Sequence, residues 1–208
     1  MSDFPSRREI RGVRIVLAGT AGGTGTTTIA ALVFESLRHS LEGAPVLYDH
    51  SGGDLGVRLT NGDDVADLDD SLALHDLGPH AFTGGIDSLE APHDLVVAVT
   101  PATPSGLTSA ADLLTAAAAR FGAAGTSRLL VVANGAQGPA GSTRAASRSV
   151  AELRDRFGQG SVVVFPRDEA LAIGGRIPLT RLALATRRGQ AALAQRTGEL
   201  LAMHRRAR

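Results

Sequence analysis

The residues best suited to chemistry form a glycine-rich turn, GTAGGTGTTT, between Gly19 and Thr28. The β-branched run Val13–Ala18 precedes the turn and predicts a buried strand, and the segment after the turn has the apolar spacing of a helix. At such a junction several backbone N–H groups converge at the positive end of the helix, where they can hold a phosphate. Gly22, Gly23 and Gly25 allow the close backbone approach that this requires. The turn therefore indicates a phosphate-binding loop.

The turn follows the phosphate-loop pattern G-x-x-x-x-G-K-[ST] imperfectly. Thr20 takes the position of the first glycine and Thr26 that of the lysine, while Thr27 matches the residue whose hydroxyl binds Mg²⁺. All 21 basic residues of the chain are arginine, so a lysine cannot come from elsewhere in the chain. The backbone amides and the helix dipole still favour phosphate binding, and an ordinary tight turn is the alternative. The expected nucleotide-binding residues of the turn are Gly22, Gly23, Thr24, Gly25, Thr26, Thr27 and Thr28.

Two aspartates follow other predicted strands. The segment 45–48 ends at Asp49, and the segment 72–74 leads to Asp76. Carboxylates in these places suit a metal–nucleotide site, so Asp49 and Asp76 are the candidate catalytic residues and Thr27 and Asp76 the candidate metal ligands. We expect Asp76 to act on Mg²⁺ through a bound water and Asp49 to position the attacking water. Each aspartate could instead cap the end of its strand.

Strands and helices alternate along the rest of the chain. Further strands are expected at 94–100, 128–133 and 161–165, and helices at 105–121, 143–157 and 179–204. This alternation predicts a single α/β domain with a mostly parallel sheet and helices on both faces. We place the domain at 12–204, between a flexible tail (1–11) and a basic tail (205–208). Five aspartates in 61–70 predict an exposed acidic loop.

Composition excludes several classes of function. The 208 residues include no cysteine, which excludes disulfides, thiol nucleophiles and cysteine metal sites. The 21 basic side chains balance 21 acidic ones, so the monomer is not expected to bind DNA directly. No apolar run is long enough to cross a bilayer, which favours a cytoplasmic protein. His75 and His80 lie near Asp76, but their spacing fits no zinc site and predicts structural roles.

Five segments between about Arg11 and Ala194 resemble motifs of the MinD/ParA family of P-loop ATPases, in the family's order. AGGTGTTTIAA resembles its deviant Walker A loop, KGGxGKTTxA; VLYDHSGGDL resembles its second strand, and LALHDLGPHA its Walker B strand. LLVVANGA and VVVFPRDEAL resemble the two late segments around the base. The resemblance implies a P-loop NTPase fold, with Asn134 contacting adenine and Pro166 and Arg167 flanking it. An Asn-Gly turn and a strand terminator beside a solvated charge are the alternatives.

The departures from the family pattern concern charge. Ala21 and Thr26 stand at its two lysine positions, and Ser51 at its second switch aspartate. Loss of the Walker lysine resembles the CpaE/TadZ branch, whose members localise pilus or secretion machinery. The resemblance then implies a positioning or scaffold protein that binds ATP or ADP with Mg²⁺ weakly and hydrolyses slowly or not at all. It also implies a homodimer and a protein partner in a secretion, pilus, septum or partition system, with recruitment to the membrane or cell pole by that partner.

Two alternatives to this function stay open. An active ATPase could use an arginine, such as Arg58 or Arg144, or a partner, in place of the lysine. A nucleotide-free interaction module would need no charge in the loop. The basic end of the last helix resembles a membrane or partner-docking element, although a core-packing helix explains its arginines as well.

Overall fold

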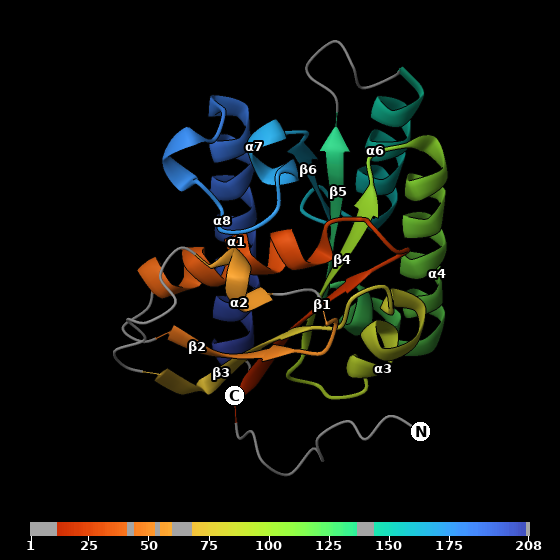
Figure 1. Ribbon diagram of the computed structural model, residues 1–208. Coiled ribbons are helices and arrows are strands. Elements are labelled where there is room, and N and C mark those ends of the chain that lie inside the picture. The colour runs from red at the N-terminus through yellow and green to blue at the C-terminus, as the bar shows by residue number, and fades with distance from the viewer. Residues whose placement is uncertain (1–11, 41–43, 53–54, 60–67, 137–143, 207–208) are drawn as a thin grey trace.

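The protein is built around a six-stranded parallel sheet, seen in a computed structural model that describes residues 12–40, 44–52, 55–59, 68–136 and 144–206 (Figure 1). The order across the sheet is β2-β3-β1-β4-β5-β6, and all five neighbouring pairs are parallel. The predicted α/β fold is confirmed. The strands are β1 (Val13–Gly19), β2 (Ala44–Asp49), β3 (Leu68–Asp76), β4 (Leu95–Pro101), β5 (Leu129–Ala136) and β6 (Val162–Pro166).

Helices cover both faces of the sheet (Figure 1). On one face α1 packs against α8, and on the other α4 packs against α6, with η1 and α3 beside β1 and β4. None of the helices in the described part of the chain is long and apolar enough to cross a bilayer. The helices are α1 (Thr26–Ser40), α2 (Leu55–Arg58), η1 (Ala81–Gly85), α3 (Ile86–Ser88), α4 (Pro104–Thr126), α6 (Arg144–Phe157), α7 (Glu169–Ala172), η2 (Leu179–Arg181) and α8 (Leu184–Arg206).

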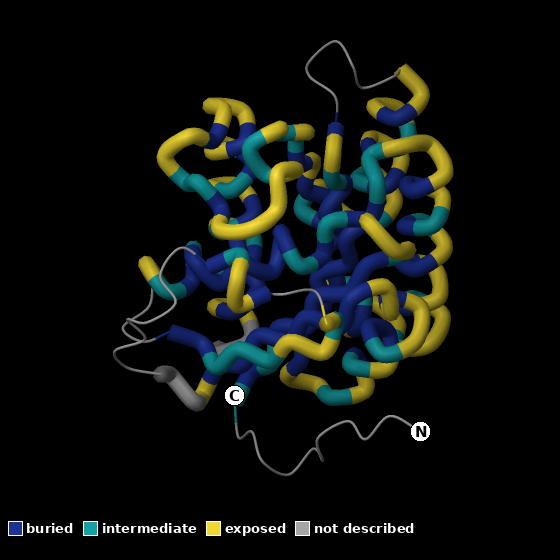
Figure 2. The backbone as a smooth tube through the Cα atoms, viewed as in Figure 1, coloured by how far each residue is buried: buried dark blue, intermediate teal, exposed yellow. Residues whose placement is uncertain are grey.

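The central strands are largely buried on both faces, which explains their mostly apolar sequences (Figure 2). In β1, Ile15 and Leu17 join the core under α1 and α8, whereas Val16 and Ala18 join the core under α4. Successive side chains of a strand point to opposite faces, so one strand contributes to both cores. The glycine-rich turn thus starts from a rigid, doubly packed strand.

The order of the strands creates a crevice at their carboxyl ends. Chain segments leave β1 toward one face, where α1 lies, and leave β4 toward the other face, where α4 lies. In open α/β sheets, ligands bind at such a switch point. The turn after β1 is held there on both sides, since the Gly19 amide donates to the Gly78 carbonyl (2.7 Å) and the Thr20 amide to the Val99 carbonyl (2.9 Å).

Three elements differ from the sequence expectations. Asp69 and Asp70 lie in β3 rather than in a loop, because Asp69 aligns with Pro45 of β2. Local composition does not reveal this pairing. Residues 61–67 of the expected acidic loop lie outside the described residues. The last helix begins at Leu184 and not at residue 179, since Leu182 has an extended backbone after η2. β5 continues through Asn134 to Ala136.

Helix α8 is an integral part of the core. It packs on α1 and β6, and Leu193, Leu200 and Leu201 are buried, whereas Met203 near its end is half exposed. The apolar side of the helix is therefore largely occupied within the protein, as the core-packing alternative expects.

Candidate functional site

A cavity of about 360 Å³ lies at the carboxyl ends of β1, β2 and β3. Its size is within the usual range of small-molecule sites. Three segments that are far apart in the sequence form it: the glycine-rich turn, the chain after β2 and the chain after β3. The lining residues are Gly23, Thr24, Gly25, Thr26, Thr27, Thr28, Ser51, Arg58, Gly78 and Pro79.

The glycine-rich turn exposes helix amides to this cavity. Gly23 (φ 73°) and Gly25 (φ 85°) have left-handed backbone conformations, which glycine adopts without strain. Helix α1 begins at Thr26. The first amide that donates a hydrogen bond to the carbonyl four residues earlier is that of Ile29, which bonds to Gly25 (3.0 Å). The amides of Thr26–Thr28 thus have no acceptor of this kind within the helix. They are placed to receive an anion.

The underside of the turn is filled by threonine side chains. The hydroxyls of Thr24 and Thr26 are 3.0 Å apart and buried, and a Cβ added to Gly19 would collide with both. Thr26, at the lysine position of the phosphate-loop pattern, therefore braces the turn and brings no charge to it. Ala21, at the family's other lysine position, is exposed and apolar.

Asn134 supports the turn from the neighbouring side of the sheet. Its Nδ2 donates to the Thr24 carbonyl (2.7 Å), and a Cβ added to Gly25 would collide with the same amide. Pro166 and Arg167 lie at the end of β6, and none of these three residues lines the cavity. Their contacts with a base stay predictions. Asn134 has in addition a bracing role that sequence reasoning missed, because the contact crosses 110 positions.

The two aspartates meet around Ser51. The Ser51 hydroxyl lies 2.8 Å from Asp49 Oδ1, 3.2 Å from Asp76 Oδ2 and 3.5 Å from the Thr27 hydroxyl. Because this hydroxyl has one proton, it can donate to only one carboxylate at a time. The structure thus brings Asp49, Asp76 and Thr27 together, with Ser51 between them.

The two carboxylates have different surroundings. Asp76 is fully buried, and its Oδ1 accepts from the Gly78 amide (3.0 Å). Asp49 is exposed; its Oδ1 accepts from the Ser51 amide (2.9 Å) and its Oδ2 from the Leu55 amide (3.0 Å), at the start of α2. Asp49 therefore fixes the chain that closes one side of the cavity.

The oxygen groups of this cluster fit Mg²⁺. Two carboxylates and two hydroxyls are hard donors, and Mg²⁺ in nucleotide sites is bound by one or two protein carboxylates together with substrate phosphates. In the described residues no group of three or more His, Cys, Asp or Glu side chains could hold a metal by itself. A metal here would accordingly need phosphate oxygens to complete its coordination.

One arginine enters the cavity. Among the described residues that line it, Arg58 alone carries a positive charge. Arg144, the other arginine considered from the sequence, is exposed at the start of α6 and does not line it. Only the folded arrangement distinguishes the two.

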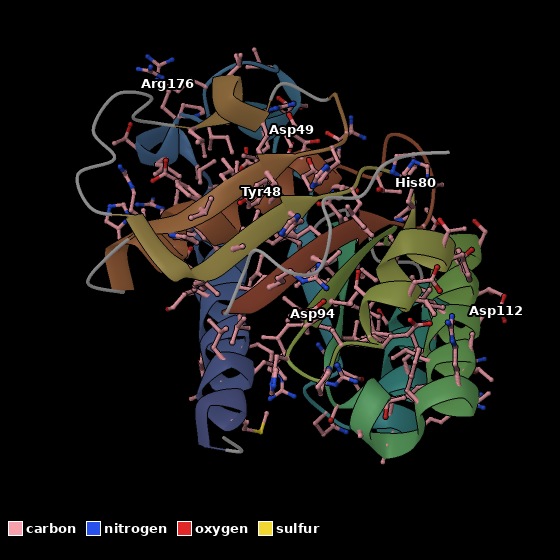
Figure 3. The ribbon with its side chains drawn as sticks, turned by 90° about the horizontal axis from the view of Figure 1, so that it is seen from below. Tyr48, Asp49, His80, Asp94, Asp112 and Arg176 are labelled. Atoms are coloured by element: carbon pink, nitrogen blue, oxygen red, sulfur yellow. The ribbon has the colours of Figure 1, made fainter. Side chains whose placement is uncertain are left out.

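A group of rings lies beside the aspartates on β2 and β3. His50 Nε2 and His75 Nδ1 are 3.0 Å apart, and the Tyr48 ring stacks on His75 with 4.6 Å between centroids. Tyr48 and Asp49 are labelled in Figure 3. Burial, then His50 and Arg14, lower the pKa of His75 to about 4, so His75 is neutral at pH 7. The spacing of 48 and 50, at and just after the end of β2, is that of side chains on one face of a strand, but the register of β2 with β3 was needed to find the His50–His75 pair.

Comparison with known proteins supports the fold. No protein-family model matches the chain, and no curated protein matches it by sequence. A ParA family ATPase from Chlorobium tepidum TLS is similar in structure with a TM-score of 0.53 at 16% identity, over 92% of this chain and 98% of that one. A chain of the MinC:MinD cell division protein complex of Aquifex aeolicus has a TM-score of 0.58 at 13% identity, over 90% of this chain and 96% of that one. The protein thus has the α/β fold of the MinD/ParA-type P-loop ATPases.

Proposed function

We propose that this chain is a MinD/ParA-like nucleotide-binding protein that holds ATP or ADP with Mg²⁺ at residues 22–28. One observation carries the proposal: the cavity at the switch point of the sheet is lined by the first-turn amides of α1 and lies next to the Asp49–Ser51–Asp76 cluster. The amides would bind phosphate oxygens. Thr27 and Asp76 would hold Mg²⁺, which would neutralise phosphate charge. Asn134, Pro166 and Arg167 would lie toward the base.

We expect hydrolysis to be slow or absent. Phosphoryl transfer depends on positive charge placed where negative charge develops, and the turn offers a buried threonine at the lysine position. Loss of one charged hydrogen bond lowers affinity by roughly one to two powers of ten, which still allows binding. Asp49, which accepts bonds from Ser51 and Leu55, would position the attacking water.

The cellular role that fits this chemistry is a nucleotide-responsive scaffold. Nucleotide at the turn would favour a homodimer, and the dimer would recruit a protein partner of a secretion, pilus, septum or partition system to the membrane or cell pole. The fold shared with a chain of the MinC:MinD complex supports a role in protein assembly. The ATPase that uses an arginine remains the second candidate, because Arg58 lines the cavity.

Calorimetric titration with Mg·ATP and Mg·ADP tests binding. Gly25→Ala should abolish the heat of both titrations, because an L-residue at φ 85° is strained and its Cβ meets Asn134. Gly198→Ala is the matched control, since no atom lies near its Cβ in α8. No heat from the wild-type protein would refute the proposal. Phosphate release at the 1–100 s⁻¹ order typical of kinases would refute slow hydrolysis.

A further inference from the structure

Arg58 enters the cavity from α2 and is held there by its backbone and its side chain. Its carbonyl accepts from the Ile177 amide (3.1 Å), and its Nη1 donates to the Leu171 carbonyl (3.1 Å). Leu55, at the other end of α2, is fully buried. A residue with both backbone and guanidinium fixed loses little freedom when it binds a ligand, which favours binding.

The guanidinium has donors to spare. Arginine carries five N–H donors in a planar fork, and the Leu171 carbonyl occupies one nitrogen, Nη1. The fork matches the geometry of phosphate and carries a positive charge. Among the described residues the partner of this side chain is a neutral carbonyl, so binding a phosphate would break no ion pair.

The position of Arg58 across the sheet indicates which phosphate it meets. Asn134 and Pro166, on the proposed base side, belong to β5 and β6. On the proposed metal side, Ser51 follows β2 and Asp76 ends β3, and Arg58 follows β2 as well. With the turn after β1 between the two sides, a nucleotide that spans the crevice points its terminal phosphate toward Arg58.

The carboxylates near the phosphate position favour such a cation. Asp49 and Asp76 are both within reach of the Ser51 hydroxyl, so a triphosphate arriving here meets two like charges. Mg²⁺ offsets part of this repulsion. A second positive group on the same side would favour the triphosphate, with its extra charge, over the diphosphate.

We propose that Arg58 binds the terminal phosphate of a nucleoside triphosphate and thereby gives this chain its preference for triphosphate over diphosphate. The inference rests on the proposed function, because it assigns one residue of the same site. It places the missing charge on the segment after β2, not in the turn. Thr26 can then serve as a buried brace without removing all positive charge from the phosphates.

The ratio of diphosphate to triphosphate dissociation constants tests the inference, measured with Mg·ADP and the non-hydrolysable Mg·AMP-PNP. Arg58→Gln should weaken AMP-PNP binding about ten- to hundred-fold and leave ADP binding near the wild-type value. Arg58→Lys should restore part of the preference because it keeps the charge. Arg176→Gln is the matched control: Arg176 is exposed and does not line the cavity (Figure 3).

The outcomes separate the two proposals. Equal weakening of both nucleotides in Arg58→Gln, while wild type binds normally, would show that Arg58 only supports α2, and no weakening would show that it does not act at all; either overturns the inference and spares the proposed function. A wild-type protein that binds neither nucleotide overturns both. Thermal melting of each variant reports whether it is folded. If Arg58→Gln does not fold, the comparison of Arg58→Lys with the wild type keeps the test decisive.

Discussion

Single hydrogen bonds decide the shape of the candidate site. The turn has no lysine, and its geometry depends on the Thr24–Thr26 hydroxyl pair and on the Asn134 amide beneath Thr24. Both contacts are polar and close to the phosphate position, so their loss would affect binding directly. Among the described residues that line the cavity, the positive charge is that of Arg58, which lies in α2 and not in the turn.

Asn134→Ala should weaken Mg·ATP and Mg·pyrophosphate binding to similar extents. The side chain holds the Thr24 carbonyl, so its removal loosens the turn for any phosphate ligand and costs about 1 kcal/mol of stability. Competition titrations with the two ligands measure this. If Asn134 acts only on adenine, ATP binding alone will fall, and bracing is then not its role.

The free energy of unfolding should fall as the pH drops from 6.5 toward 4, in part because of His75. Its pKa is about 4 in the folded protein and 6.5 ordinarily, so in this window the unfolded chain takes up a proton that the folded chain excludes. The slope from this residue approaches roughly 1 kcal/mol per pH unit. Urea denaturation of His75→Gln should give a flatter pH profile. The exposed His80 provides the control, and a His75→Gln profile as steep as that of His80→Gln would contradict this origin.

At the scale of elements, the strands were predictable and the short helices were not. Residues 15–18, 95–99 and 129–133 are continuous apolar runs, as expected of parallel strands covered on both faces. Helix α2 is four residues long and has no periodicity to detect; it is fixed by Asp49 and Leu55. The position of Arg58 depends on that helix, which is why sequence reasoning could name Arg58 and Arg144 but not choose between them.

Asp168 fastens α7 to the start of α8. Its Oδ1 accepts from the Ala170 amide (2.9 Å), and its Oδ2 accepts from the Ala183 amide (2.9 Å) and the Thr186 hydroxyl (2.6 Å). Burial opposes the charge of this carboxylate, but the bonds from Thr186, Ala183 and Ala170 outweigh it and lower the pKa of Asp168.

Asp168→Ala should therefore lower the free energy of unfolding by about 1–2 kcal/mol, since it removes a helix cap and two further bonds. Because the pKa of Asp168 is lowered on folding, its contribution is present above the ordinary carboxyl pKa and is lost as the pH falls through the folded value. Chemical denaturation at pH 7 and pH 3 checks both effects. Asp112→Ala, at an exposed position of α4 (Figure 3), is the control and should leave stability nearly unchanged; an equal loss in both variants would contradict the role of Asp168.

At the scale of the molecule, we expect the proposed homodimer to form with nucleotide. Sedimentation of the 21.3 kDa chain should shift toward twice this mass with Mg·AMP-PNP and stay monomeric with Gly25→Ala. Linkage requires this shift if nucleotide binds the dimer more tightly than the monomer. A mass that does not depend on nucleotide would contradict nucleotide-controlled assembly.

Strand β1, at the centre of the sheet, precedes the other described strands in the sequence. Residue 13 pairs with residue 72 of β3, and residue 15 pairs with residue 95 of β4. On the ribosome, β1 lacks its β3 neighbour until residue 72 has emerged and its β4 neighbour until residue 95 has emerged, and contacts this distant form slowly. An apolar strand exposed for that long is prone to aggregation, so the yield of native protein should depend on translation speed and on chaperones that shield nascent chains.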